Sequence, residues 1–284
     1  MKSFERTKKL FHDLHFEVKN ITQIFGGMSN YNYLVETNKG NFTIRFSGEE
    51  FSANKYIDRE TEETVIKALS GFLFTPETIY FDSKTGIKIT KYLEGTPLDK
   101  MDTVPIEKVS ELLKKLHSLK VNINIDYPHR LKLYESFVRH KNEKYLKIKK
   151  ELLSFKLNDD NCVFVHGDSQ PSNFIMHKGK VFIIDFEFAS KAPKMADIAA
   201  FANFNDCLGF ELLKEYYKET LDNKKLFDYY WWQSFFAIMW YNVALYKHEI
   251  GLSEKLKIDF KYLIEFYLQK AETMLLKAKE YLDD

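Results

Sequence analysis

The chain has 284 residues, and its 42 lysines and arginines nearly balance its 41 aspartates and glutamates, which leaves a net charge of +1. Apolar residues make up 45% of the chain and charged residues 29%, a composition that excludes a disordered or collagen-like protein. The near-neutral balance also argues against nucleic acid as the main partner. The length is enough for two lobes with a sizeable core.

Few features of the sequence bear on where in the cell the protein works. Cys162 and Cys207 are too few for a disulfide framework and indicate a reducing compartment. The N-terminal residues lack the apolar run of a signal peptide. The most apolar stretch, 231–246, is shorter than the ~20 residues that a membrane helix needs. We therefore expect a cytoplasmic protein with no membrane span, and the sequence leaves its oligomeric state open.

The first 93 residues predict a small antiparallel sheet with one helix. Short apolar or alternating stretches between turn residues indicate strands, and one stretch has apolar residues at helical spacing. On the third strand Phe42, Ile44 and Phe46 share one face, which puts Arg45 on the opposite face. We expect strands at 21–25, 31–36, 42–46, 79–81 and 87–92, and a helix at 58–69.

The remainder of the chain predicts a larger, mainly helical lobe. Glycine and proline at 94–97 mark the boundary, so we expect one lobe at residues 1–93 and a second at residues 94–284. One island of short strands, 162–184, interrupts the helical pattern. The predicted fold class is therefore α+β with two lobes, and we expect helices at 105–119, at 134–155 (one helix or a pair) and from 210 onward.

The island of strands holds the residues best suited to chemistry. Asp168 follows its first strand, and Asn173 precedes a hairpin that turns at 178–179 and ends at Asp185. We expect Asn173 and Asp185 side by side, where an amide oxygen and a carboxylate can share one Mg²⁺. Asp168 can accept a proton from a hydroxyl nucleophile, so the set predicts phosphoryl transfer. The alternative is that His166, Asp168 and Asn173 only satisfy backbone groups of their loop.

The first lobe offers groups that suit a phosphate. Glycine lets the backbone approach a phosphate closely, although an ordinary hairpin turn is the alternative for this loop. The loop that links the first two strands consists of Gly26, Gly27, Met28, Ser29 and Asn30.

An acid on the predicted helix indicates an ion pair. Glu62 lies on the apolar stripe of that helix, and an acid at a core-facing position needs a cation. Arg45 is the natural partner, and such a pair would hold ATP phosphates. Glu63 is the competing acid, and a solvated strand residue is the alternative for Arg45.

Taken together, these motifs resemble those of the choline/ethanolamine kinase family, within the aminoglycoside phosphotransferase and protein-kinase-like superfamily. The resemblance runs from about residue 21 to residue 246. The motifs that carry it are Gly26 to Asn30, Arg45 in place of the usual kinase lysine, Ile57-Asp58-Arg59 ahead of Glu62, His166 to Asn173, and Asp185-Phe186-Glu187.

The resemblance implies a two-lobed protein-kinase-like fold that uses ATP and Mg²⁺, with residues 1–93 as the nucleotide-binding lobe and residues 94–284 as the catalytic and substrate-binding lobe. It implies Asp168 as the catalytic base and Asn173 with Asp185 as metal ligands. It also implies that a hinge near Lys91 to Glu94, which includes Tyr92, binds adenine through its backbone.

The segment after Asp185 bears on the substrate. Only eleven residues separate Asp185 from Asp197, too few for a long activation segment, which disfavours protein substrates. Asp197 itself matches an aspartate that commonly braces the catalytic loop in this superfamily.

For the acceptor, the resemblance implies Gln170, Glu187 and Trp240 as substrate-binding residues. Trp240 aligns with one tryptophan of a cage whose ring faces bind a quaternary ammonium. The second cage tryptophan falls at Val243, and an acid of the family falls at Phe204. We expect a small amino alcohol, choline or ethanolamine first. The alternatives are another small alcohol (an aminoglycoside, thiamine or a sugar) or a non-catalytic nucleotide-binding module.

Overall fold

The computed structural model describes residues 2–24, 30–47, 57–123, 127–139, 142–155 and 161–282. The chain folds into two compact units. The hairpin of the strand island packs with the first unit, whereas the sequence assigns it to the second lobe; the functional division after residue 93 stays a prediction. The first unit comprises Met1–Lys100 and Phe174–Phe188, and the second comprises Met101–Asn173 and Ala189–Asp284.

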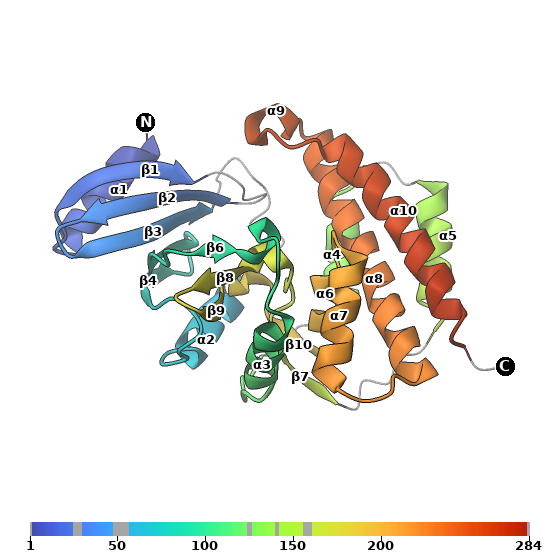
Figure 1. The fold of residues 1–284 in the computed structure, drawn as a ribbon. Coiled ribbons are helices and arrows are strands. Elements are labelled where there is room, and N and C mark those ends of the chain that lie inside the picture. Colours follow the sequence, from blue (N-terminus) through green and yellow to red (C-terminus); the bar gives the residue numbers. More distant parts are fainter. Residues whose placement is uncertain are drawn as a thin grey trace. The chain divides into compact units, whose positions relative to one another are not determined.

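A five-stranded antiparallel sheet in the order β1-β2-β3-β5-β4 forms the centre of the first unit. Phe42, Ile44 and Phe46 lie buried on one face, as predicted. The helix α1 (Lys2–Asp13) packs on this core through Phe11 (Figure 1). The sheet contains β1 (Val18–Ile24), β2 (Asn30–Thr37), β3 (Gly40–Ser47), β4 (Thr78–Asp82) and β5 (Ile87–Lys91).

The helix α1 corrects the expectation of one helix in this lobe. The many charged residues of this helix obscure a short apolar face in the sequence. On that face Phe11 is fully buried, and Leu10 and Leu14 pack beside it. The predicted helix is present as α2 (Arg59–Ala68), and the side chain of Asp58 caps its first turn.

The hairpin that follows Asn173 forms as predicted. β8 (Phe174–His177) pairs with β9 (Lys180–Ile183), and β6 (Thr96–Pro97) adds a third strand. The turn residue Gly179 has a φ of 77°, the left-handed conformation that glycine adopts without strain. After β9 the chain continues to the short helix η4 (Phe186–Phe188), which contacts α2 within the first unit.

The second unit is mainly helical, and its longest helices α8 and α10 pack along each other (Figure 1). The predicted helical stretch 134–155 is a pair of helices whose first member begins earlier. Among the described residues, no helix has the length and apolar character to cross a membrane. The elements are η2 (Leu98–Lys100, in the first unit), α3 (Ile106–His117), α4 (Tyr127–Ser136), α5 (Glu143–Leu152), β7 (Cys162–Val165), η3 (Pro171–Asn173), β10 (Ser190–Pro193), α6 (Met195–Phe201), α7 (Asp206–Tyr217), α8 (Asn223–Glu249), α9 (Ser253–Leu256) and α10 (Phe260–Lys279).

Candidate active site

Asp197, a fully buried residue of α6, holds the loop between β7 and η3. Its carboxylate accepts hydrogen bonds from the backbone N–H of His166 (2.8 Å) and of Gly167 (3.0 Å), and His117 Nε2 lies 3.1 Å from it. Ser169 Oγ donates to the backbone oxygen of Asp197 at 2.6 Å. Asp197 therefore braces this loop, as the resemblance implies.

Asp197 is ionised in spite of its burial. Burial alone would raise the pKa of its carboxyl group, but the hydrogen bond and charge of His117 and the contacts of His166 lower that pKa below its ordinary value. The loop is thus anchored on a negative charge that the surrounding donors stabilise.

Two amide side chains orient the carboxylate of Asp168. Asn173 Nδ2 donates to Asp168 Oδ2 at 3.0 Å and to the Asp168 backbone oxygen at 2.7 Å. Gln170 Nε2 lies 3.4 Å from the same Oδ2. Because the amino group of Asn173 donates to Asp168, the amide oxygen of Asn173 is the atom that remains suited to a metal ion. Asp168, Gln170 and Asn173, all predicted as site residues, therefore lie together in the second unit.

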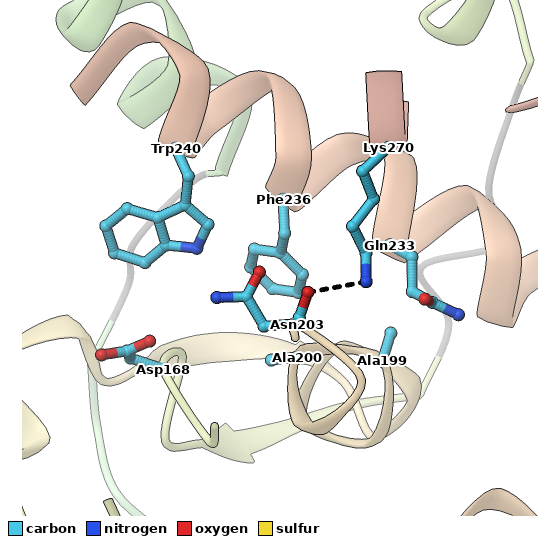
Figure 2. A pocket seen from close by; sticks show the side chains of 8 residues that line it. All are labelled: Asp168, Ala199, Ala200, Asn203, Gln233, Phe236, Trp240 and Lys270. Atoms are coloured by element: carbon cyan, nitrogen blue, oxygen red, sulfur yellow. Dashed lines mark hydrogen bonds between the residues drawn. The ribbon is translucent and has the colours of Figure 1, made fainter. Parts of the chain in front are cut away.

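Asp168 lies on the wall of a small pocket within the second unit, opposite a group of residues from α8 and α10 (Figure 2). Its empty space, open solvent included, is about 260 Å³. Trp240, predicted as an acceptor-binding residue, lies above Asp168 in this pocket, and Phe236 lies beside it. The lining residues are Asp168, Ala199, Ala200, Asn203, Gln233, Phe236, Trp240 and Lys270.

Asn203 and Lys270 belong to this pocket and were not predicted. Asn203 Nδ2 lies 3.2 Å from Gln170 Oε1 and 3.3 Å from the hydroxyl of Tyr267. The sequence carried a signal for Lys270, because it follows Tyr267 by three residues and precedes Ala271, both on the buried side of α10. A lysine at a core-facing helical position requires acceptors.

Phe204 and Val243, the two positions that depart from the choline-site pattern, do not line this pocket. Phe204 is 58% exposed and stacks on Phe266 with ring centroids 5.4 Å apart. Val243 is buried in α8. Asp206, the nearest acid to Phe204, pairs with Lys270.

The predicted ion pair between Arg45 and Glu62 is present within the first unit. Arg45 Nη2 donates to Glu62 Oε2 at 2.8 Å, and both side chains are buried. The competing acid, Glu63, instead pairs with Lys67 on the exposed side of α2. Arg45 is therefore part of a buried network and is not a solvated strand residue.

Two further cations join this network. Arg59 Nη1 contacts Glu62 and also lies 3.0 Å from Glu187 Oε2. Lys88, which faces Arg45 across the β3–β5 pairing, places its Nζ 3.0 Å from Glu62 Oε1. Their roles were not predicted, although Lys88 alternates with the buried Ile87 and Ile89 as Arg45 alternates with its apolar neighbours.

Asp185 lies at the edge of the network. Arg45 Nη1 is 3.5 Å from Asp185 Oδ1 and 3.2 Å from Glu187 Oε2, and Lys88 Nζ is 4.0 Å from Asp185 Oδ1. Its side chain is 37% exposed and its backbone adopts a φ of 66°, an uncommon conformation that aspartate tolerates better than most residues. Asp185 thus keeps a solvent-facing carboxylate among the cations.

The network favours the charged forms of Glu62 and Arg45 but disfavours that of Glu187. Burial alone would raise the pKa of Glu62, but Lys88, Arg45 and Arg59 lower it well below the ordinary range. Burial alone would lower the pKa of Arg45, but the nearby carboxylates raise it. Burial and the charge of Asp185 raise the pKa of Glu187 against the pull of the two arginines.

The other predicted site residues belong to the first unit. Glu187 is 6% exposed, and its two oxygens accept from Asn30 Nδ2 at 3.2 and 3.0 Å, so it belongs to the network of the first unit; its role toward an acceptor stays a prediction. The backbone N–H groups of Lys91 and Tyr92 donate to the carbonyls of Glu77 and Asn41, so these two donors are engaged, and adenine binding by the backbone of this segment stays a prediction. Gly26, Gly27, Met28 and Ser29 lie outside the described residues.

We expect Arg59→Gln to destabilise the protein by about 2 kcal/mol, because it removes charged hydrogen bonds from two buried carboxylates. Urea unfolding measures this change. The matched control is Lys67→Gln on the same helix, which breaks only an exposed ion pair and should alter stability little. Equal effects of the two substitutions would contradict a stabilising role for the network.

These features define a protein-kinase-like fold, shared with solved structures of a choline kinase and of a spectinomycin phosphotransferase. A model of the choline/ethanolamine kinase family matches residues 21–230. The chain therefore belongs to the choline/ethanolamine kinase family.

Similar proteins cover the chain to different extents. The choline kinase LicA of Streptococcus pneumoniae is 24% identical, covers 97% of this chain and 99% of its own, and superimposes with a TM-score of 0.81. A LicA structure in complex with AMP is 22% identical, covers 98% of both chains and has a TM-score of 0.77. Protein LicA of Haemophilus influenzae is 24% identical over 216 residues, and the match spans 70% of this chain and 62% of the length of that relative.

Proposed function

We propose that this protein is an ATP- and Mg²⁺-dependent phosphotransferase that phosphorylates the hydroxyl group of a small amino alcohol, choline or ethanolamine. The observation that carries the proposal is the position of Asp168. Its carboxylate, oriented by Asn173 and Gln170, lies on one small pocket with the ring of Trp240. Family membership supports the same reaction class.

In this proposal Asp168 accepts the proton of the acceptor hydroxyl. Asn173 and Gln170 hold the carboxylate in one orientation, and Asp197 holds the loop that carries it. A base positioned in this way contributes to catalysis because it needs no reorganisation as the hydroxyl attacks.

The phosphate donor is proposed to be ATP, held by residues of the first unit. Arg45 has a fixed position through Glu62, and the 26–30 loop would contact phosphates through its backbone. Since the N–H groups of Lys91 and Tyr92 belong to the sheet, adenine recognition falls to the backbone that follows them. A relative that binds AMP supports the choice of an adenine nucleotide.

The residues present fit Mg²⁺ as the metal. The amide oxygen of Asn173 and the partly exposed carboxylate of Asp185 are hard oxygen donors, and Mg²⁺ is commonly held by one or two carboxylates plus substrate phosphates. When bound, the ion would neutralise charge on the transferring phosphoryl group.

A first assay measures Mg²⁺-dependent ADP release with choline and with ethanolamine, each at millimolar concentration, against a blank without acceptor. We expect acceptor-dependent release that is lost when EDTA removes the metal. Retained ATP binding without release for either acceptor would contradict an amino-alcohol substrate and favour another small alcohol. Release would exclude a non-catalytic nucleotide-binding module.

A further inference from the structure

Lys270 places a cation in the wall of the acceptor pocket, and its hydrogen bonds are complete. Its Nζ donates to the backbone oxygens of Ala202 (2.6 Å) and Asn203 (2.7 Å) and to Asp206 Oδ1 (2.8 Å). An ammonium group has three N–H donors, so these acceptors satisfy all of them. The side chain is only 8% exposed. Figure 2 shows the ammonium turned toward the backbone of Asn203.

The acceptors around Lys270 together make a site built for an ammonium ion. The carbonyls follow the C-terminal end of α6, where the helix dipole concentrates negative charge, and Asp206 adds a carboxylate. The protein fills this site with its own lysine. A substrate cannot use these oxygens unless Lys270 leaves them.

The amino group of Asn203, another polar group of the pocket, is also engaged. Gln170 Oε1 and the hydroxyl of Tyr267 both lie within 3.3 Å of Asn203 Nδ2. The amide of Gln233 is directed away from Asp168 and Trp240 (Figure 2). One amide oxygen, such as that of Asn203, can satisfy at most one of the three donors of a primary ammonium.

The two expected acceptors make opposite demands on such a pocket. Choline and ethanolamine both have two carbons between hydroxyl and nitrogen, so their nitrogens reach the same region when the hydroxyl meets Asp168. A primary ammonium needs hydrogen-bond acceptors there and is penalised when they are missing. A quaternary ammonium has no N–H donor and needs ring faces, which Trp240 and Phe236 supply on the same pocket.

We propose that Lys270 is a specificity-determining residue that makes the acceptor pocket favour N-alkylated amino alcohols over primary amines. It does so by occupying the oxygens that a substrate ammonium would otherwise bind. The inference rests on the proposed function, since it takes Asp168 as the group that meets the acceptor hydroxyl. Lys270 touches no reacting atom, and its effect falls on KM more than on kcat.

The test compares kcat and KM for choline and ethanolamine in the wild type, Lys270→Met and Lys270→Arg. We expect the wild type to favour choline in kcat/KM by at least about tenfold, because unsatisfied donors are rejected strongly. Lys270→Met frees the carbonyls and Asp206, so the KM for ethanolamine should fall and the preference shrink by about tenfold. Lys270→Arg keeps a cation on the same oxygens and should keep the preference. A wild type with no preference, or a Met variant that loses both activities equally, would overturn the proposal.

Equilibrium dialysis with radiolabelled choline and ethanolamine separates this inference from the proposed function. If no acceptor supports ADP release, the kinase proposal fails, and tighter binding of choline than of ethanolamine by the wild type would still support the role of Lys270. Equal binding of both would overturn it. Thermal denaturation checks that Lys270→Met folds; if it does not, Lys270→Gln, which also releases Asp206, is measured in the same way with the same expected shift.

Discussion

Asp168→Asn should lower kcat by about 10²- to 10⁴-fold, because it removes the proposed general base while conserving the size of the side chain. The amide groups of Asn173 and Gln170 that now donate to the carboxylate can donate to the new amide oxygen. Asp168 is only partly buried, so the loop should keep its structure. The measurements are steady-state ADP release and binding of a fluorescent ATP analogue, and ATP affinity should stay nearly unchanged.

The control for this substitution is Glu211→Gln, which makes the same chemical change on the exposed surface of α7. It should leave kcat and stability unchanged. If Asp168→Asn also turns over at nearly the wild-type rate, another group takes the proton and the assignment of Asp168 is wrong. A loss of ATP binding together with kcat would instead indicate a structural effect.

The strand and helix pattern of the first unit was largely predictable from the sequence, because it depends on local alternation. Phe42, Ile44 and Phe46 mark one face of β3, and that regularity also exposed Glu62 as an acid at a buried helical position. The pair between Glu62 and Arg45 follows, since each is a buried charge that needs a partner. The helix α1 was not predicted, because its sequence has few apolar residues among many charged ones.

The contacts that link distant segments were harder to predict. Arg59 joins α2 to Glu187, which lies 128 positions further along the chain. Asp197 meets His117 across 80 positions. No local periodicity encodes such partners, and the position of Glu187 next to Asp185 in the sequence carried no information on its contacts with Arg59 and Asn30. The same limit applies to Lys270, whose acceptors come from the end of α6.

Asp197→Asn is expected to destabilise the protein by about 3–5 kcal/mol, the range for removing one partner from a buried charged network. An asparagine amide can accept from only one of the two backbone N–H groups of His166 and Gly167, and its own amino group would face a donor. Urea unfolding at neutral pH measures the loss. Asp13→Asn at the exposed end of α1 is the control and should change stability little. A similarly small effect at Asp197 would mean that the loop does not depend on this carboxylate.

The pH dependence of the same pair of proteins gives a second test. The folded state lowers the pKa of Asp197, so its ionised carboxylate stabilises the fold above the unfolded pKa of about 3.9. That contribution is lost as the pH falls through the lower folded pKa, where the carboxyl group takes up a proton in both states. The stability difference between wild type and Asp197→Asn should therefore be constant from neutral pH down to about pH 5 and should shrink below about pH 4. A difference that grows as the pH falls would contradict an ionised Asp197 as the anchor of the loop that carries Asp168.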